Sequence, residues 1–232
     1  MEHRSPLNTA FYAGQVKTVR LLLDSKAELD YTNRRMWTSP RYIFDPQLTK
    51  MDTIQLLDIC AAQGFDQWDT QDVVGWTIFH RASAFGGGSD IEKLLNLRAS
   101  SNIYTFKLNW LPIFCAVKFG NESTFEVLVD LIHPLALPNF KDSRGWTLLH
   151  LAAENGSEAI MTQLLQRGLD PLAKTDQSAI SLPEELSLKE LTVGDIASFC
   201  NNQDAYERAL KTTDRSMMSK HPPDRTSLSD EG

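Results

Sequence analysis

The stretch Thr147-Leu148-Leu149-His150-Leu151-Ala152 decides the fold of this chain, because its pattern recurs elsewhere at matching positions. A second copy, Thr77-Ile78-Phe79-His80-Arg81-Ala82, keeps the threonine, the histidine and the alanine. A glycine follows nine residues after the first member of each copy, at Gly156 and Gly86. Internal repetition of this kind predicts a solenoid of stacked units. Weaker copies begin at Ser5, Thr38 and Leu111, so that the starting points lie 33 to 39 residues apart.

Each strong copy carries the local signals of a short helix followed by a second helix. Thr77 and Thr147 have hydroxyl groups that can cap the first helix, since threonine is favoured at that position. Gly86 and Gly156 come where the first helix must stop, and glycine favours a left-handed cap there. An apolar stretch with helical spacing follows each glycine, as in residues 160–165. Each repeat is therefore predicted to be a helix pair with one buried face.

A period near 33 residues with a Thr-Pro-Leu-His-x-Ala core resembles the ankyrin-repeat family over residues 5–171. The resemblance implies an all-α solenoid with short β-hairpin fingers, built from five repeats in residues 1–171. The second repeat has lost the histidine and the glycine, and residues 41–50 look like an insertion. The fourth repeat, which begins at Leu111, lacks the threonine and the histidine.

The pattern weakens after residue 171. Thr192, with Asp195 three residues later, resembles the start of another capped helix. We expect residues 172–210 to form an insertion loop and a divergent sixth repeat that caps the stack, because terminal repeats of a solenoid are atypical. Residues 211–232 are polar and are expected to be a disordered tail.

Composition excludes several classes of function. The chain has 232 residues, of which 42% are hydrophobic, and a net charge of −7. An acidic chain is a poor partner for a phosphate backbone, so no direct nucleic-acid binding is expected. Three distant cysteines without a Cys-x-x-Cys pair argue against a zinc site or a disulfide framework, and no metal or cofactor is expected. No apolar stretch reaches the ~20 residues of a membrane span, so we expect a cytoplasmic or nuclear protein without a membrane contact.

His80 and His150 are the histidines that share a repeated position. A threonine–histidine pair could suggest catalysis, but catalytic groups must converge on one point. Recurrence in separate repeats indicates a structural role, and the resemblance implies that the imidazole joins adjacent repeats by hydrogen bonds. The run at residues 86–88, three glycines, could cradle an anion at a helix N-terminus. We favour a turn between helices, and we expect neither enzymatic activity nor a small-molecule substrate.

Four of the five tryptophans occupy one repeat position, directly before the first residue of the core pattern. They are Trp37, Trp76, Trp110 and Trp146. The resemblance implies that this position belongs to the concave face that contacts partners, where the four side chains would form a ladder. The alternative is that the indoles pack between fingers and hold them in place. Both interpretations stay open, since one edge of an indole can pack while the other stays exposed.

The resemblance places further aromatic and basic residues on the same face. Such side chains are typical of binding hot spots, and the basic ones suggest a partner with acidic groups. We predict a non-enzymatic protein–protein interaction scaffold or adaptor, and a coregulator that binds a transcription factor is one form within the family's range. The alternative is a purely structural repeat unit or a fragment of a larger ankyrin protein. The predicted contact residues besides the tryptophans are Tyr12, Phe85, Phe119, Arg34, Arg35, Lys107, Lys118 and Arg144.

Overall fold

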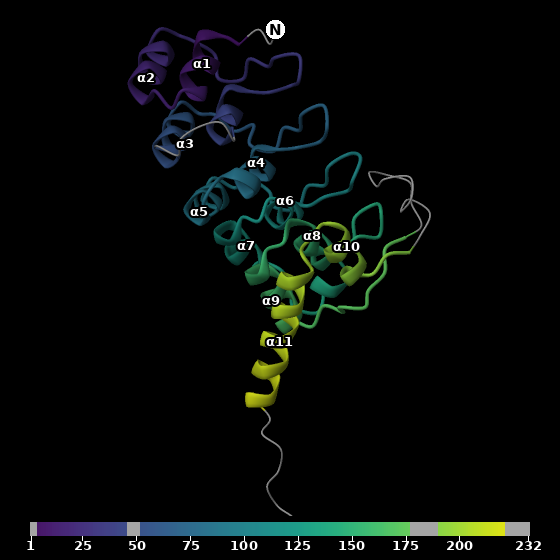
Figure 1. The fold of residues 1–232 in the computed structure, drawn as a ribbon. Coiled ribbons are helices and arrows are strands. Elements are labelled where there is room, and N and C mark those ends of the chain that lie inside the picture. The colour runs from purple at the N-terminus through teal and green to yellow at the C-terminus, as the bar shows by residue number, and fades with distance from the viewer. Residues whose placement is uncertain (1–3, 46–51, 177–189, 221–232) are drawn as a thin grey trace, which may run out of the picture.

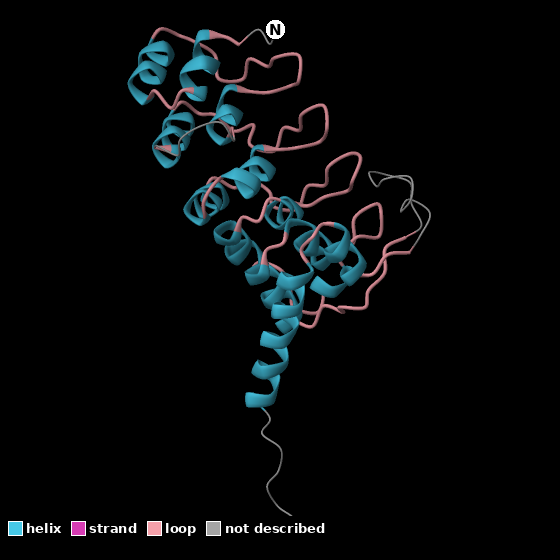
Figure 2. Cartoon of the chain, in the orientation of Figure 1, coloured by secondary structure: helices cyan, strands magenta, loops and turns pink. Residues whose placement is uncertain are grey.

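The computed structural model describes residues 4–45, 52–176 and 190–220, which form an elongated stack of helix pairs (Figures 1 and 2). Two rows of helices run along the stack, and loops that we call fingers project beside the first row (Figure 2). The first row contains α1 (Pro6–Tyr12), η1 (Ser39–Phe44), α4 (Ile78–Phe85), α6 (Pro112–Lys118), α8 (Leu148–Asn155) and α10 (Val193–Phe199). The second row contains α2 (Val16–Asp24), α3 (Thr53–Ala62), α5 (Gly88–Asn96), α7 (Glu122–Val129), α9 (Glu158–Gln166) and α11 (Gln203–Lys220). A short 3-10 helix, η2 (Leu137–Asn139), lies in the loop after α7.

Hydroxyl side chains begin several helices of the first row. Ser5 Oγ accepts a hydrogen bond from the Asn8 N–H at 3.1 Å. Thr77 caps α4 and Thr192 caps α10 in the same way. Helix α6 has no side-chain cap, but it begins at Pro112, whose missing N–H needs no partner at this position.

The glycines that end the first-row helices use two different conformations. Gly156 ends α8 with a φ of +85°, in the left-handed region. Gly86 ends α4 with a φ of −86°, so the expected left-handed cap is wrong at this position. A Cβ on Gly86 would lie 2.7 Å from the Ala82 carbonyl oxygen. Glycine is therefore needed at residue 86 for space and not for backbone conformation.

The second repeat departs most from the common pattern. Its first helix is the six-residue 3-10 helix η1, and all six residues are buried. Arg41 within it donates from Nη2 to the carbonyl oxygen of Thr70, in the next finger. The expected insertion at residues 41–50 therefore begins inside η1, and its residues 46–50 lie outside the described residues.

The fingers are tight turns and not regular hairpins. Among the described residues no strand is formed, and pairing is limited to isolated bridges such as that between Lys141 and Thr147. The Asp142 N–H donates to the Trp146 carbonyl oxygen at 2.9 Å and closes the turn. The β-hairpin fingers implied by the resemblance are therefore present as turns that are too short for strands.

Small and large apolar side chains fill the space between the rows. Ala82, Ala116 and Ala152 are fully buried, and their small size lets first-row helices approach one another. Ile91 and Leu94 of α5 are fully buried from the second row. Burial of each such aliphatic side chain contributes about 1.5–3 kcal/mol, so the interface between rows is the main source of stability.

The last helix covers the C-terminal end of the stack. Helix α11 packs on α9 and buries Tyr206, Ala209 and Thr213. The expected disordered tail is wrong for residues 211–220, because they continue α11, whose buried side shields α9 from water. The expected insertion loop at residues 177–189 and the tail at residues 221–232 lie outside the described residues. Of the described helices, none is long and apolar enough to cross a membrane.

His80 and His150 each join one repeat to the next. The Thr77 N–H donates to His80 Nδ1 at 3.1 Å, so this nitrogen carries no proton. The proton is on Nε2, which donates to the Trp110 carbonyl oxygen in the next repeat at 3.1 Å. His150 repeats the arrangement, with Nε2 3.3 Å from the Leu191 carbonyl oxygen. Both side chains are fully buried and neutral, as structural groups in a repeat interface must be.

Acid should destabilise the folded stack, because the buried imidazole rings of His80 and His150 resist protonation. Burial lowers the pKa of His80 and of His150 from 6.5 to about 4, so between these pH values the unfolded state binds more protons. The free energy of unfolding should fall as the pH drops from 6.5 to 4, by up to about 3 kcal/mol per histidine.

Urea unfolding across this pH range measures the effect. His80→Gln and His150→Gln, each made alone, should show a weaker pH dependence than the wild type. His133→Gln, at an exposed loop position, is the matched control and should keep the wild-type pH dependence. An unchanged pH dependence in both buried variants would contradict the assignment.

Candidate partner-binding face

Hydrogen bonds between fingertips hold successive fingers side by side. In each pair, a backbone N–H at the turn of one finger donates to a carbonyl oxygen of the finger before it. We call the surface made by the fingers and the first-helix row the concave face (Figure 1). The four bonds are Val73 N–Arg35 O (3.3 Å), Phe106 N–Val74 O (3.3 Å), Ser143 N–Leu108 O (3.0 Å) and Asp176 N–Arg144 O (3.0 Å).

A buried carboxylate lies at the turn of the second finger. Asp72 Oδ2 accepts a hydrogen bond from the indole Nε1–H of Trp37, in the finger before, at 3.1 Å. Guanidinium nitrogens of Arg41 and Arg81 lie 3.5 and 3.7 Å from the same oxygen. The Arg81 guanidinium also stacks 3.6 Å from the Trp37 ring. Burial lowers the pKa of Arg41 to about 10, an effect that Asp72 opposes.

The fourth finger repeats this arrangement with different residues. Asp142 Oδ2 accepts from Trp110 Nε1–H at 3.0 Å and from Arg144 Nη2 at 2.6 Å. The Arg144 guanidinium lies 4.2 Å from the centre of the Trp146 ring. Each carboxylate thus satisfies a tryptophan from the preceding finger and an arginine cation in one buried cluster, as buried charges require.

Three of the four tryptophans are therefore not on an exposed ladder. Trp37, Trp110 and Trp146 are 7%, 6% and 2% exposed, so the expectation that they contact a partner is wrong in this structure. Arg144 is also buried, and its predicted role as an exposed basic contact is wrong because its charge is neutralised by Asp142. Packing between fingers, the alternative interpretation, describes these three tryptophans.

Trp76 differs from the other three tryptophans, because it is only half-buried. The finger that follows it has no carboxylate at its turn, and the same is true of the fifth finger, where Thr175 follows the buried Trp146. Thr105 stands in the place that Asp72 and Asp142 occupy in their fingers, and its hydroxyl accepts the Trp110 backbone N–H. Among the described residues, no group accepts a hydrogen bond from the indole nitrogen of Trp76. Its side chain is half-buried and turned to neighbouring aromatic rings instead.

Trp76, Phe85 and Phe119 form an aromatic cluster on the concave face. The ring centres of Trp76 and Phe85 are 6.5 Å apart, those of Trp76 and Phe119 are 6.1 Å apart, and those of Phe85 and Phe119 are 4.8 Å apart. Phe119 is 44% exposed, and the other two rings are partly exposed. The three residues come from a finger and from the ends of two first-row helices. The structure therefore brings together three of the predicted contact residues.

The remaining predicted contact residues are distributed along the same face. Arg34, Arg35 and Lys107 are exposed on the fingers. Tyr12 is partly buried under the guanidinium of Arg4, 4.1 Å from the ring centre. Lys118 is half-buried and pairs with Glu154 at 2.6 Å, next to the aromatic cluster.

Three asparagines that the sequence analysis did not single out also join the repeats. Asn121 donates to the carbonyl oxygens of Ser83 and Gly86, at the end of the first-row helix before it. Asn155 and Asn202 make equivalent bonds to the preceding repeat. Asn121 and Asn155 lie next to the glycines Gly120 and Gly156, and Asn202 lies two residues after Cys200, the C-cap residue of its first-row helix. The last carbonyl groups of a helix lack partners, so an asparagine just after a first-row helix or at its end is the signal that could have found them.

The glycine run at residues 86–88 does not form an anion site. The Asp90 carboxylate already accepts the Gly87 N–H at 2.8 Å and the Thr53 hydroxyl at 2.5 Å. A second negative charge at this helix start would be repelled by Asp90. The run forms the turn between α4 and α5.

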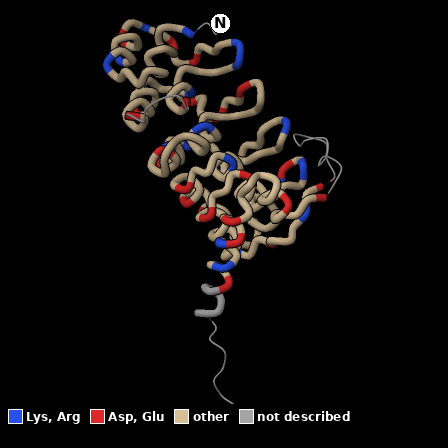
Figure 3. The backbone as a smooth tube through the Cα atoms, viewed as in Figure 1, with Lys and Arg blue, Asp and Glu red and all other residues tan. Residues whose placement is uncertain are grey.

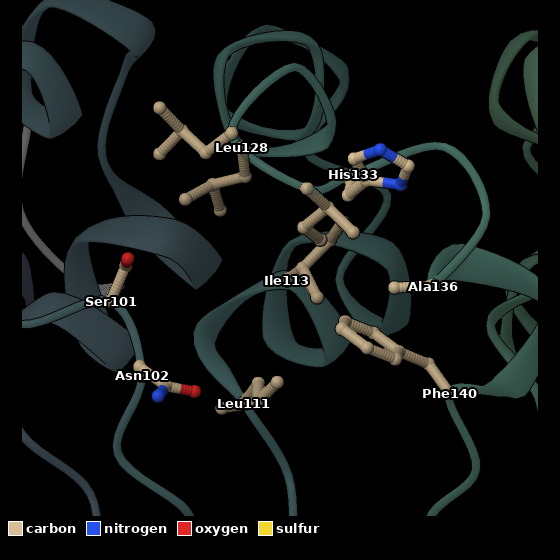
Figure 4. Close-up of a pocket in the computed structure, with 10 residues that line it drawn as sticks. Ser101, Asn102, Leu111, Ile113, Leu128, His133, Ala136 and Phe140 are labelled. Atoms are coloured by element: carbon tan, nitrogen blue, oxygen red, sulfur yellow. The ribbon is translucent and has the colours of Figure 1, made fainter.

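A hollow of about 240 Å³ lies away from the fingers, between the loop after α5 and the loop after α7 (Figure 4). Its walls are mainly apolar, from Leu111, Ile113, Leu128 and Phe140, and His133 lies at its edge. The volume suits a single side chain better than a substrate. Within the described residues, no three histidine, cysteine or acidic side chains gather as metal ligands would.

Stacked helix pairs, fingers in a hydrogen-bonded array and a threonine–histidine bridge between units define a helical repeat protein. The family model described as ankyrin repeats (3 copies) matches residues 79–175. Residues 79–175 are thus similar to ankyrin repeats, which are protein-interaction modules, and the helix pairs on either side of this segment continue the same stack.

Known proteins with similar sequences are much longer. Human transient receptor potential cation channel subfamily A member 1 is 28% identical over 176 residues, 72% of this chain and 15% of the channel subunit. Mouse 60 kDa lysophospholipase is 37% identical over 83 residues, 35% of this chain and 14% of that protein. The chain thus spans about one seventh of each relative.

A solved structure shares the fold. It is a chain of the complex between the predatory endopeptidase Bd0816 of Bdellovibrio bacteriovorus and the immunity protein Bd3460. The TM-score is 0.69, and the alignment covers 90% of this chain and 98% of that chain. Sequence identity is 18%, so the likeness concerns the fold alone.

Removal of a finger carboxylate should cost much stability. Asp142→Ala leaves the buried Arg144 cation and the Trp110 indole N–H without an acceptor, so the free energy of unfolding should fall by about 3 kcal/mol or more. Urea unfolding followed by tryptophan fluorescence measures the change. Asp130→Ala, which removes an exposed carboxylate paired with Arg167, should cost less than about 1 kcal/mol. Equal losses in the two variants would contradict the role of the buried cluster.

Proposed function

We propose that this chain is a non-enzymatic interaction module that holds a partner protein on its concave face. The observation that carries the proposal is the aromatic cluster of Trp76, Phe85 and Phe119. The other three finger tryptophans are buried, and the indole N–H groups of Trp37 and Trp110 are bonded to buried carboxylates, whereas this cluster keeps apolar surface in contact with water. Burial of such surface by a partner is favourable, at roughly 25 cal/mol per Å².

The cluster has the composition and the place of a binding centre. Tryptophan is among the residues most enriched in hot spots, and hot spots gather near the middle of an interface. The three residues belong to the third and fourth of the repeats, at the centre of the stack. An ion pair between Lys118 and Glu154 lies beside the rings and can form part of a polar rim.

Two further considerations support a protein as the partner. The net charge of −7 disfavours nucleic acid. A fold of this kind occurs in a solved complex between an endopeptidase and an immunity protein, which is itself an assembly of two proteins. Within this proposal the chain acts as an adaptor or regulator in the cytoplasm or the nucleus, and a coregulator of a transcription factor is one such role.

Substitution in the aromatic cluster tests the proposal. The partner is first captured by crosslinking to the wild-type chain and identified by mass spectrometry, and its affinity is then measured by calorimetry. Trp76→Ala and Phe119→Ala should each weaken binding by about 2 kcal/mol, or about 30-fold. Their unfolding free energies should change less than that of Trp110→Ala, which disrupts a buried cluster.

Leu131→Ala is the matched control, because Leu131 is 51% exposed at the end of the second-row helix α7. This variant should bind as the wild type does. If both cluster variants bind with unchanged affinity while their stability falls, the rings have a packing role and the purely structural alternative gains support.

A further inference from the structure

The tips of three successive fingers expose large apolar side chains. Met36, Val73, Val74 and Phe106 are 47%, 56%, 55% and 66% exposed. We call these four residues the fingertip ridge. Large apolar side chains that are exposed singly are ordinary, but a row of them on adjacent turns is typical of an interaction surface.

The ridge is continuous because the fingers are bonded to one another. Val73 N–H donates to the Arg35 carbonyl oxygen, and Phe106 N–H donates to the Val74 carbonyl oxygen, each at 3.3 Å. These bonds join the backbones of the three turns that carry the ridge. The side chains are therefore presented by one ordered edge, which lowers the entropic cost of binding an extended segment.

Exposed cations flank the ridge. Arg34, Lys107 and Lys141 are exposed and have no acidic partner among the described residues. Figure 3 shows basic residues at the ends of fingers. The acidic residues in the turns of the first four fingers, Asp72 and Asp142, are both buried and neutralised. The tips of the first and third fingers, which carry Arg34 and Lys107, are thus basic in a chain whose net charge is −7, whereas the tip of the fifth finger carries the exposed Asp176.

The first finger also presents an unused backbone donor. In each of the four fingers that follow, the backbone N–H of the second turn residue donates to a carbonyl oxygen of the finger before. Val73 is this residue in the second finger. The equivalent group in the first finger is the Arg34 N–H, and it has no acceptor among the described residues. A partner carboxylate at this end of the ridge could accept a hydrogen bond from the Arg34 backbone N–H and pair with the Arg34 guanidinium group.

We propose that the fingertip ridge binds an extended segment of the partner in which acidic and apolar residues alternate. Apolar side chains of the segment lie on the ridge, and its carboxylates pair with Arg34, Lys107 and Lys141. The inference rests on the proposed function, because it names the chemistry of a partner held on the concave face. It adds a contact region separate from the aromatic cluster and predicts salt-dependent binding.

Fluorescent peptides test the ridge without a known partner. The probes are a set of peptides that combine leucine with glutamate at varied spacing, a matching leucine–lysine set, and a serine–glutamate set. Fluorescence anisotropy with the full chain should show binding by members of the leucine–glutamate set only, and weaker binding as salt is raised. Phe106→Ser and Lys107→Glu should each reduce this affinity about tenfold.

The matched controls are Leu21→Ser and Lys17→Glu on α2, because Leu21 is 66% exposed, as is Phe106. Both should bind the peptides as the wild type does. Absence of binding by the whole leucine–glutamate set, or equal binding by the leucine–lysine set, would overturn the inference.

The captured partner separates this inference from the proposed function. Loss of partner binding in Trp76→Ala with full retention in Phe106→Ser and Lys107→Glu would overturn the ridge and leave the proposed function standing. Loss in the two ridge variants with full retention in Trp76→Ala and Phe119→Ala would support the ridge and overturn the cluster as the binding centre.

Discussion

A buried carboxylate at the turn of a finger is the constraint on which the concave face depends. Asp72 and Asp142 each lie away from water, so each must be surrounded by donors and positive charge. Each takes the indole N–H of the preceding tryptophan and a neighbouring guanidinium group. The carboxylate thereby fixes one finger against the next, in addition to the backbone bonds between turns, which also join the fingers that have threonine in its place. The structure of the concave face at these two fingers is thus set by charge satisfaction as much as by apolar burial.

Two fingers, the third and the fifth, have a threonine in place of this carboxylate. Thr105 stands where an aspartate would accept the Trp76 indole N–H, and its hydroxyl is engaged with the Trp110 backbone. Trp76 packs against Phe85 and Phe119 and keeps part of its surface in water. Thr175 takes the same place after Trp146, which is nevertheless 2% exposed, so the missing carboxylate alone does not set the exposure of a finger tryptophan. Trp76 is a candidate contact residue because it also lies beside two partly exposed phenylalanines.

The sequence was sufficient to predict the fold because the helix starts and stops are local signals. The capping contacts of Thr147, His150 and Gly156 lie within one helix, so their spacing predicts where that helix begins and ends. Tryptophan exposure was not predictable in the same way, because all four tryptophans occupy one repeat position. Burial of Trp110 depends on Asp142, in another finger, and nothing near Trp110 in the sequence indicates that pairing. The helical residues 211–220 were missed for a similar reason, since α11 is stabilised by its contact with α9.

The rate at which each indole N–H proton exchanges with solvent tests most directly whether Trp76 differs from the buried tryptophans. In a chain labelled with nitrogen-15 at tryptophan, NMR spectra resolve the indole N–H of each tryptophan, and single Trp→Phe variants assign the signals. The Trp37 and Trp110 protons, which are bonded to buried carboxylates, should exchange slowly, and the Trp76 proton should exchange much faster. Protection of Trp76 equal to that of Trp110 would contradict the claim that the Trp76 indole, which has no acceptor among the described residues, is available to a partner.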